Sequence, residues 1–415
     1  MAKTRISQVD QSSTKSRSKL ETKAGNHAYE IPYPNGFFTL EGLGEGTWSA
    51  LSYDQSASLG YIRNPIAHRC IRLICEAMGS LDLVTHESGE EFSEHPLLDL
   101  MRYPNDQQGG AEFLQSLIGY YLVSGEAFVH ASLGSDGKAS QLFTLRPDCV
   151  KKLVSADGWV GAFEYSSGTG TNSVRSVYMN GKWDEDIGSL LHLSSFNPLD
   201  QTKGLSPLQS AQSALRIHNA ASGWNLALLK NSARPSGALV FAPRDGGNLT
   251  DDQFSRLKSE LEANYTGARA AGRPLVLEGG LDWKAMGYSP KDMDFIEAKQ
   301  AAAREIALAL GVPPMLLGLP GDNTYSNYQE ANRAVWKQTI VPLARRIFSG
   351  FSHWVRPIYG PTIRLDFNAD QVADLASDRD RLWERIGKAD FLTVDEKREA
   401  LGYGPAPMRV DFNDE

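Results

Sequence analysis

Apolar residues recur at helical spacing in some stretches of this chain and at every second position in others. The first predicted helix lies within 64–81, with Asn64 as its cap and Pro65 in its first turn. Its apolar stripe is formed by Ala67, Ile71, Ile74 and Met78. A second helix is predicted at 110–124. Residues 125–154 then alternate around a hairpin turn at 135–138, and further strands are predicted at 159–166, 174–179 and 189–195. This first block is predicted to be α+β.

The second half of the chain has two long helical patterns around a small insert. One helix is predicted at about 206–232, a length of roughly 40 Å, and the other at about 290–310. The insert begins with a strand at 236–243 and continues with a helix opened by a Thr250–Gln253 capping box. It ends with a hairpin whose turn holds Glu278, Gly279 and Gly280. The second long helix stops at Gly311, and its apolar face is formed by Ile296, Ala303, Ile306 and Leu310.

A glycine- and proline-rich loop follows at 318–326. Ser326 and Gln329 are predicted to form a capping box that starts a long helix. Six large apolar residues recur along it every three or four positions: Trp336, Ile340, Leu343, Ile347, Phe351 and Trp354. Their burial is worth on the order of 10 kcal/mol. An interior proline costs about 3 kcal/mol, so Pro342 should kink the helix without ending it. A strand at 362–367 and helices at about 370–388 and 393–401 follow, the last opened by Thr393 and Glu396.

Composition narrows the class of protein. The 415 residues are 41% hydrophobic, with a formal net charge of −8, and no run of about 18 apolar residues predicts a membrane span. The negative charge argues against a protein that grips nucleic acid over a large surface, although DNA could still slide past it. Residues 1–29 are rich in polar residues and are predicted to be a disordered tail. Cys70, Cys75 and Cys149 are interpreted as buried small hydrophobes in a reducing compartment.

No catalytic constellation is recognisable in these patterns. The sequence lacks a G-x-x-x-x-G-K-[ST] phosphate loop, an H-E-x-x-H pair and a C-x-x-C pair. We therefore predict no catalytic residue, no metal and no cofactor, and we interpret His218 as a packed or solvated helix residue. A four-residue spacing of carboxylates indicates a solvated acidic face formed by Asp366, Asp370, Asp374 and Asp378.

The order of helix, insert, helix, loop and helix resembles the portal proteins of tailed bacteriophages. LLHLSSFNPLDQTKGLSPLQSAQSALR, at 190–216, looks like the approach to the family's first stem helix. FIEAKQAAAREIALALGVPPMLLG, at 295–318, is similar to its second stem helix and the turn after it. NTYSNYQEANRAVWKQTIVPLARRI, at 323–347, resembles the tunnel loop and long wing helix, and FLTVDEKREALGYGPAP, at 391–407, resembles the closing motif. The resemblance covers roughly 60–410.

The resemblance implies an α+β protomer of the portal type. Its parts would be the tail at 1–29, a wing at 30–205, stem helices at 206–234 and 290–310, a clip at 236–288, a tunnel loop at 311–326, a long wing helix and strand at 327–365, and a short crown at 366–415. The part of the tunnel loop that faces DNA would be Gly318, Leu319, Pro320, Gly321, Asp322, Asn323, Thr324 and Tyr325.

It also implies a ring, usually of twelve subunits, at one capsid vertex, through which double-stranded DNA enters and leaves without sequence-specific contacts. The clip, with the hairpin turn at 278–280, would meet the terminase large subunit during packaging and the head–tail adaptor afterwards. The major capsid protein would be a further partner, and no membrane would be involved. The subunit would assemble in the host cytoplasm and become part of the virion. Gene transfer agents use the same component, so a phage, a prophage and a gene transfer agent are all open as sources.

Two readings from other classes stay open at this stage. A hydrolase would use 318–326 as an active-site lid and draw its acid and base groups from the acidic residues around 366–380. A nucleic-acid-binding module would need a basic face, which the sequence does not reveal. Electron microscopy would separate these readings, because only the portal predicts a ring with a central hole.

Overall fold

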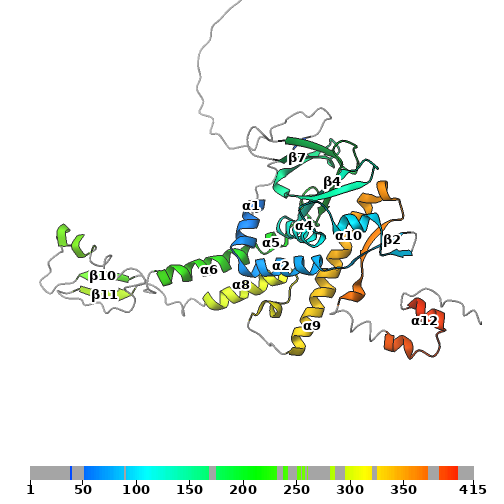
Figure 1. Cartoon of the computed structure of the whole chain (residues 1–415). Helices are drawn as coiled ribbons and strands as arrows, with labels where there is room; N and C mark the ends of the chain where they lie inside the picture. The colour runs from blue at the N-terminus through cyan, green and yellow to red at the C-terminus, as the bar shows by residue number, and fades with distance from the viewer. Residues whose placement is uncertain are drawn as a thin grey trace, which may run out of the picture.

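Figure 1 shows a body of helices and sheets from which α6 (Gln212–Lys230) and α8 (Phe295–Ala309) project side by side. This computed structural model describes residues 38–39, 51–87, 90–167, 174–230, 237–241, 250–253, 255–257, 259, 281–285, 295–319, 325–372 and 383–400. Helices and strands alternate within these residues, so the predicted α+β class is confirmed. The predicted tail at 1–29 lies outside the described residues.

The core of the body is built from α2 (Pro65–Gly79), α4 (Gly110–Ser124) and α10 (Val341–Tyr359). α2 begins where predicted, because the side-chain oxygen of Asn64 accepts the amides of Ile66 and Ala67 at 3.1 and 3.0 Å. The predicted apolar stripe of α2 is fully buried. α10 contributes Ile347 and Phe351 to the same core, and both are fully buried as well.

The strands form four small sheets. One has the order β1 (Phe38–Thr39), β6 (Val150–Val154), β7 (Val160–Ser167) and β8 (Val174–Met179). A second has the order β5 (Ala139–Leu145), β4 (Glu126–Leu133) and β9 (Ser189–Ser194). A third has the order β12 (Arg364–Phe367), β2 (Leu83–Glu87) and β3 (Glu90–Phe92). The fourth pairs β10 (Gly237–Phe241) with β11 (Leu281–Ala285). All of these pairings are antiparallel.

Short elements complete the described chain, and several of them escaped prediction. They are α1 (Tyr53–Gln55), the π-helical turn η1 (Ser56–Ile62), α3 (Pro96–Arg102), α5 (Pro207–Ser210), η5 (Pro314–Leu317), α9 (Tyr325–Val335), the π-helical turn η6 (Trp336–Ile340) and α12 (Val394–Ala400). Short 3₁₀ turns, η2 (Pro147–Cys149) and η7 (Ala369–Gln371), lie beside β6 and after β12. The capping boxes at Thr250–Gln253 and Thr393–Glu396 are confirmed.

The prediction of a single helix at 206–232 is wrong, because the structure has two helices there, α5 and α6. The backbone leaves the helical region at Ala211 (φ −88°, ψ 11°), which separates α5 from α6. α5 begins where the Ser206 hydroxyl accepts the Leu208 amide at 3.0 Å, and it turns the fully buried Leu208 into the core. The straight part, α6, is about 28 Å long, and the break removes the first six residues, about 9 Å, from the predicted rod.

The long helix predicted after the loop also differs in detail. α9 begins at Tyr325, so Ser326 lies inside the helix and the prediction that it caps the helix is wrong. The proline at 342 is accommodated by η6 rather than by a kink alone. Proline has no N–H to donate and its ring crowds the preceding turn. The wider turn places the Val341 amide on the Trp336 carbonyl, five residues back, and α10 then starts with the proline in its first turn.

Three side chains lie elsewhere than predicted. Ile296, predicted to share the apolar face of its helix, is 70% exposed, whereas Ala303 and Ile306 on the same helix are buried. Cys149 is half-buried, not buried like Cys70. Asp366 lies in strand β12, so it does not belong to a helical acidic face.

Candidate functional site

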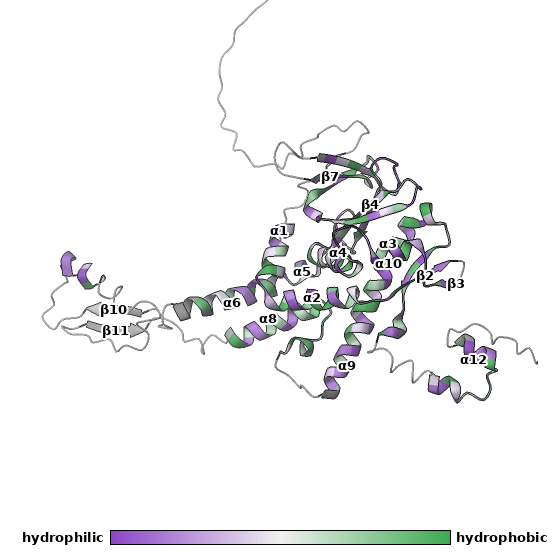
Figure 2. Ribbon diagram, in the orientation of Figure 1, coloured by the Kyte–Doolittle hydropathy of each residue, from purple (hydrophilic) through white to green (hydrophobic). Residues whose placement is uncertain are grey.

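The paired helices α6 and α8 bury one face of each helix and leave apolar residues on the others. Between them, Leu215, Ala303 and Ile306 are at most 2% exposed. On the outside, exposed fractions reach 53% for Leu226 and 79% for Leu308. Figure 2 shows the resulting mixture of polar and apolar residues on both helices. Apolar side chains exposed along a projecting helix pair favour contact with another protein surface.

The end of α8 anchors the loop that the sequence singled out. Gly311 has a φ of +68°, and its amide donates to the Leu308 carbonyl at 3.0 Å. The Val312 amide donates to the Ala307 carbonyl at 2.9 Å, which completes a Schellman C-cap. The hydroxyl of Thr339, in η6, donates to the Gly311 carbonyl at 2.6 Å. The base of the loop is therefore tied to the long helix that follows it.

The predicted tunnel-loop residues lie partly within the described chain. Gly318 is exposed with a φ of +68° at the end of η5, and Leu319 is half-buried. Tyr325 is the first residue of α9. The other members, Pro320, Gly321, Asp322, Asn323 and Thr324, lie outside the described residues. The described ends thus lie between two helices, but their approach to DNA stays a prediction.

The predicted clip is described only in part. β10 and β11 pair in register, with Gly237 opposite Ala285 and Phe241 opposite Leu281. In Figure 1 they lie beyond the far end of α6. The predicted hairpin turn, Glu278, Gly279 and Gly280, lies outside the described residues. β10 precedes the helix opened by Thr250, and β11 follows it. Because these two strands pair with each other, the insert closes on itself as a small sheet.

A buried ionic cluster fixes the segment that enters α5. One carboxylate oxygen of Glu126 accepts hydrogen bonds from the Lys152 ammonium, from the Gly204 amide at 2.9 Å, and from His192 at 3.3 Å when its Nε2 is protonated. The Lys152 ammonium also donates to the Thr202 carbonyl at 2.6 Å. Side chains of Glu126 and Lys152 are only 11% and 10% exposed. We did not predict this cluster, because its members come from strands distant in the sequence.

The electrostatics of the cluster are dominated by burial and by its own hydrogen bonds. Burial opposes ionisation of Glu126, but the hydrogen bond with His192 and the charge of Lys152 outweigh it, so the pKa of Glu126 is lowered. Burial also lowers the pKa of Lys152, against the pull of the Glu126 carboxylate. The charge attraction between the two groups and the hydrogen bond that joins them both oppose the effect of burial.

Two glycines bring the backbones of this junction into contact. Gly125 has a φ of +80°, and a Cβ built on Gly204 would lie 2.0 Å from the Gly125 carbonyl oxygen. The hydroxyl of Ser195 adds hydrogen bonds to the carbonyls of Gly125 and Leu205 at 2.9 and 2.7 Å. The sheet β5–β4–β9 and the start of the projecting helices are thus held as one rigid unit.

Other chemistry is limited in the described part of the chain. No group of three or more potential ligands gathers there to hold a metal, and no helix found there is both long and apolar enough to cross a bilayer. His218 is buried, and its Nδ1 lies 3.2 Å from the amide nitrogen of Asn64. Of the two predicted alternatives, a packed or a solvated helix residue, His218 is the packed one.

Fold and site together define a subunit built for assembly, in which a rigid α+β body supports a projecting helix pair and an anchored loop. The sequence matches the phage portal protein family over residues 65–402, and the chain belongs to that family. Portal proteins are structural components and not enzymes.

Individual relatives agree with this membership. A chain in the neck of a native gene transfer agent particle, computed with C12 symmetry, is 44% identical, with a TM-score of 0.65, and the match covers 88% of this chain and 97% of that one. A protein of Rickettsia bellii is 39% identical over 344 residues, which is 82% of this chain and 87% of the other. The probable portal protein of Streptomyces phage phiC31 is 26% identical over 348 residues, covering 81% and 74%.

Proposed function

We propose that this protein forms the portal ring of a virion or gene transfer agent particle, a channel through which double-stranded DNA is packaged and ejected. The observation that supports this most directly is the projecting α6–α8 pair with its exposed Leu226 and Leu308, in a chain of the portal family. A monomer leaves these apolar residues in water, whereas a ring of side-by-side copies buries them. Twelve copies agree with the symmetry of the related gene transfer agent neck.

The parts of the protomer take the roles that the resemblance implies. Residues 30–205 and 327–365 form the wing, 206–234 and 290–310 the stem, 236–288 the clip, and 366–415 the crown. The clip meets the terminase large subunit and then the head–tail adaptor, and the wing lies against the major capsid protein. The ring assembles in the host cytoplasm and remains at one vertex of the particle.

The loop at 311–326 faces the DNA. Its base is rigid because Gly311 is capped and bonded to Thr339, while its sequence from 318 to 323 is rich in glycine, proline and polar residues. A weakly acidic loop on a fixed base can touch a moving polyanion without holding it. The acidic net charge of −8 agrees with a channel that DNA passes through without being trapped.

Replacing the loop tests this role separately from assembly. A variant with 319–325 shortened to a brief Gly-Ser link keeps the rigid base, so rings should form normally while full-length packaging or retention of DNA falls. A second variant, Asp322→Lys with Asn323→Lys, should slow translocation, more so at low salt because salt screens the added attraction. Packaged DNA length and single-particle translocation rates are the measurements. Wild-type values in both variants would exclude contact between this loop and DNA.

The clip is tested by replacing its hairpin turn at 278–280. Rings and capsid incorporation should be preserved, because the insert's sheet β10–β11 is separate from the body, while packaging or tail joining should stop. Normal yields of infectious or transducing particles from such a variant would contradict the assignment of the clip.

A further inference from the structure

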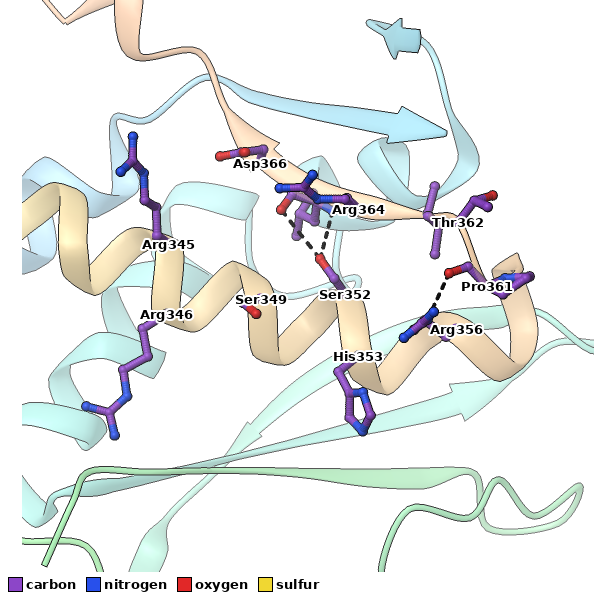
Figure 3. A pocket seen from close by; sticks show the side chains of 12 residues that line it. Arg345, Arg346, Ser349, Ser352, His353, Arg356, Pro361, Thr362, Arg364 and Asp366 are labelled. Carbon is purple, nitrogen blue, oxygen red and sulfur yellow. Dashed lines mark hydrogen bonds between the residues drawn. The ribbon is translucent and has the colours of Figure 1, made fainter. Parts of the chain in front are cut away.

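A basic pocket opens between α10 and β12, on a part of the body that the proposed channel does not involve. Its volume is about 1070 Å³. Figure 3 shows Arg345, Arg346 and Arg356 on the helix and Arg364 on the strand, with Asp366 as the carboxylate among its lining residues. Arg345, Ser349, Ser352 and Arg356 follow one face of α10 over twelve residues, about 16 Å. This polar stripe is the signal in the sequence that could have indicated the pocket. Arg346 points to the other side of the helix in Figure 3.

The positive charge of this pocket is not compensated within the subunit. The guanidinium groups of Arg346 and Arg356 donate to backbone carbonyls, those of Ser194 and Pro361, at 2.7 and 2.9 Å. Those bonds fix the two side chains but add no counter-charge. In the described part of the chain, no ion pair involves any of the four arginines. Four arginines against one carboxylate are unusual on a protein of net charge −8.

The opposite edge of the same sheet is acidic. β3 carries Glu90 and Glu91. Glu87 ends β2 opposite Glu90, and Glu94 follows two residues after β3. Glu90, Glu91 and Glu94 are exposed, and none of the four glutamates forms an ion pair with a described residue. Phe92, among them, is 37% exposed. The β3 edge therefore presents negative charge around an accessible apolar side chain.

Strand order keeps the two charged edges apart within one subunit. β2 lies between β12 and β3, and the register places Arg364 opposite His86 and His86 opposite Glu91. Two strand spacings separate Arg364 from Glu91, about 10 Å, so they do not meet. Ser352 of α10 closes the β12 edge, because its hydroxyl accepts the Leu365 amide at 2.8 Å. The β3 edge has no described strand beside it.

We propose that the acidic β3 edge of one subunit docks into the basic pocket of the next copy of this chain. Opposite edges of one sheet point in opposite directions, which is the arrangement that head-to-tail contacts around a ring require. This inference rests on the proposed ring and adds a contact that orders the subunits within it.

Charge reversal tests the contact in the full-length protein. The pocket variant is Arg345→Glu with Arg364→Glu, and the edge variant is Glu90→Lys with Glu91→Lys. Each should lower the ring fraction, measured by native mass spectrometry, at least tenfold at a fixed protein concentration. All four substitutions in one chain should restore assembly to within about threefold of wild type, because every interface again joins opposite charges. The matched control, Lys138→Glu with Lys182→Glu, reverses exposed charges elsewhere and should assemble normally.

The rescue separates docking from misfolding, since a misfolded variant is not repaired by further reversals. If the wild type forms rings and neither charge reversal weakens them, the docking is wrong, while the proposed portal function is unaffected. The glutamates would then serve only to protect the edge strand from pairing. Normal rings that lose DNA binding in the pocket variant would assign the pocket to a polyanion and overturn the docking. Absence of rings in wild type under all conditions would overturn both proposals.

Discussion

Replacing Lys152 by Met should destabilise the folded body, because it removes the cation of a buried ion pair. The substitution keeps the length of the side chain but leaves Glu126 ionised, about nine-tenths buried, and without its cation. Removing one partner of a buried pair costs about 3–5 kcal/mol. The hydrogen bonds from the Gly204 amide and from His192 persist, so we expect the lower end, about 3 kcal/mol. For a unit of 150–250 residues that lowers Tm by about 6–12 °C.

The measurement is thermal unfolding followed by circular dichroism, combined with hydrogen exchange of the amides at 196–206. Lys182→Met, at an exposed position away from the cluster, is the matched control and should change stability by less than about 0.5 kcal/mol. Adding Glu126→Gln to Lys152→Met should recover at least half of the loss, because the uncompensated charge disappears while the amide oxygen still accepts from Gly204. Equal stability of Lys152→Met and the control, or no recovery in the double variant, would refute the reasoning.

Three further predictions concern pH, the loop base and the thiols. The pKa of Glu126 is below its usual 4.5 in the folded state. The ionised carboxylate therefore contributes its full stabilisation above pH 4.5 and loses it as the pH falls through the lowered pKa. The difference in stability between wild type and Glu126→Gln, measured by denaturant titration, should narrow only below about pH 4.5. Gly311→Ala should cost about 2–3 kcal/mol and Gly318→Ala about 1 kcal/mol. Both have a φ of +68°, but only the first Cβ meets a hydroxyl oxygen, at 2.6 Å; equal losses in chemical denaturation would contradict this. Burial raises the pKa of Cys70 to about 12, so a maleimide should label the half-buried Cys149 first in the native protein, and the reverse order in mass spectrometry would be inconsistent with the structure.

Local signals in the sequence predicted most helix and strand boundaries. Asn64 before Pro65, and Thr393 three residues before Glu396, specify helix starts through bonds that form within one turn. The same logic misplaced the start of α9 by naming Ser326, because the helix had already begun at Tyr325.

Features that depend on distant contacts were not predictable in this way. The helix breaks at Ala211, next to the turn that buries Leu208 in the core, and no residue type marks that position. Ile296 fits the spacing of a buried stripe, yet it lies beyond the part of α8 that the body covers. The contacts of Lys152 with Glu126 join residues 26 positions apart, which no local pattern connects. The family resemblance, by contrast, could be recognised from segment order alone.

Electron microscopy of the purified protein tests the central claim most directly. Averaged views down the symmetry axis should show a closed ring, of twelve subunits as in the related gene transfer agent neck, with a central channel and the α6–α8 pairs packed side by side around it. The loops at 311–326 should line the channel. Particles without a central hole, or rings in which the α6–α8 pairs do not pack side by side, would contradict the portal assignment.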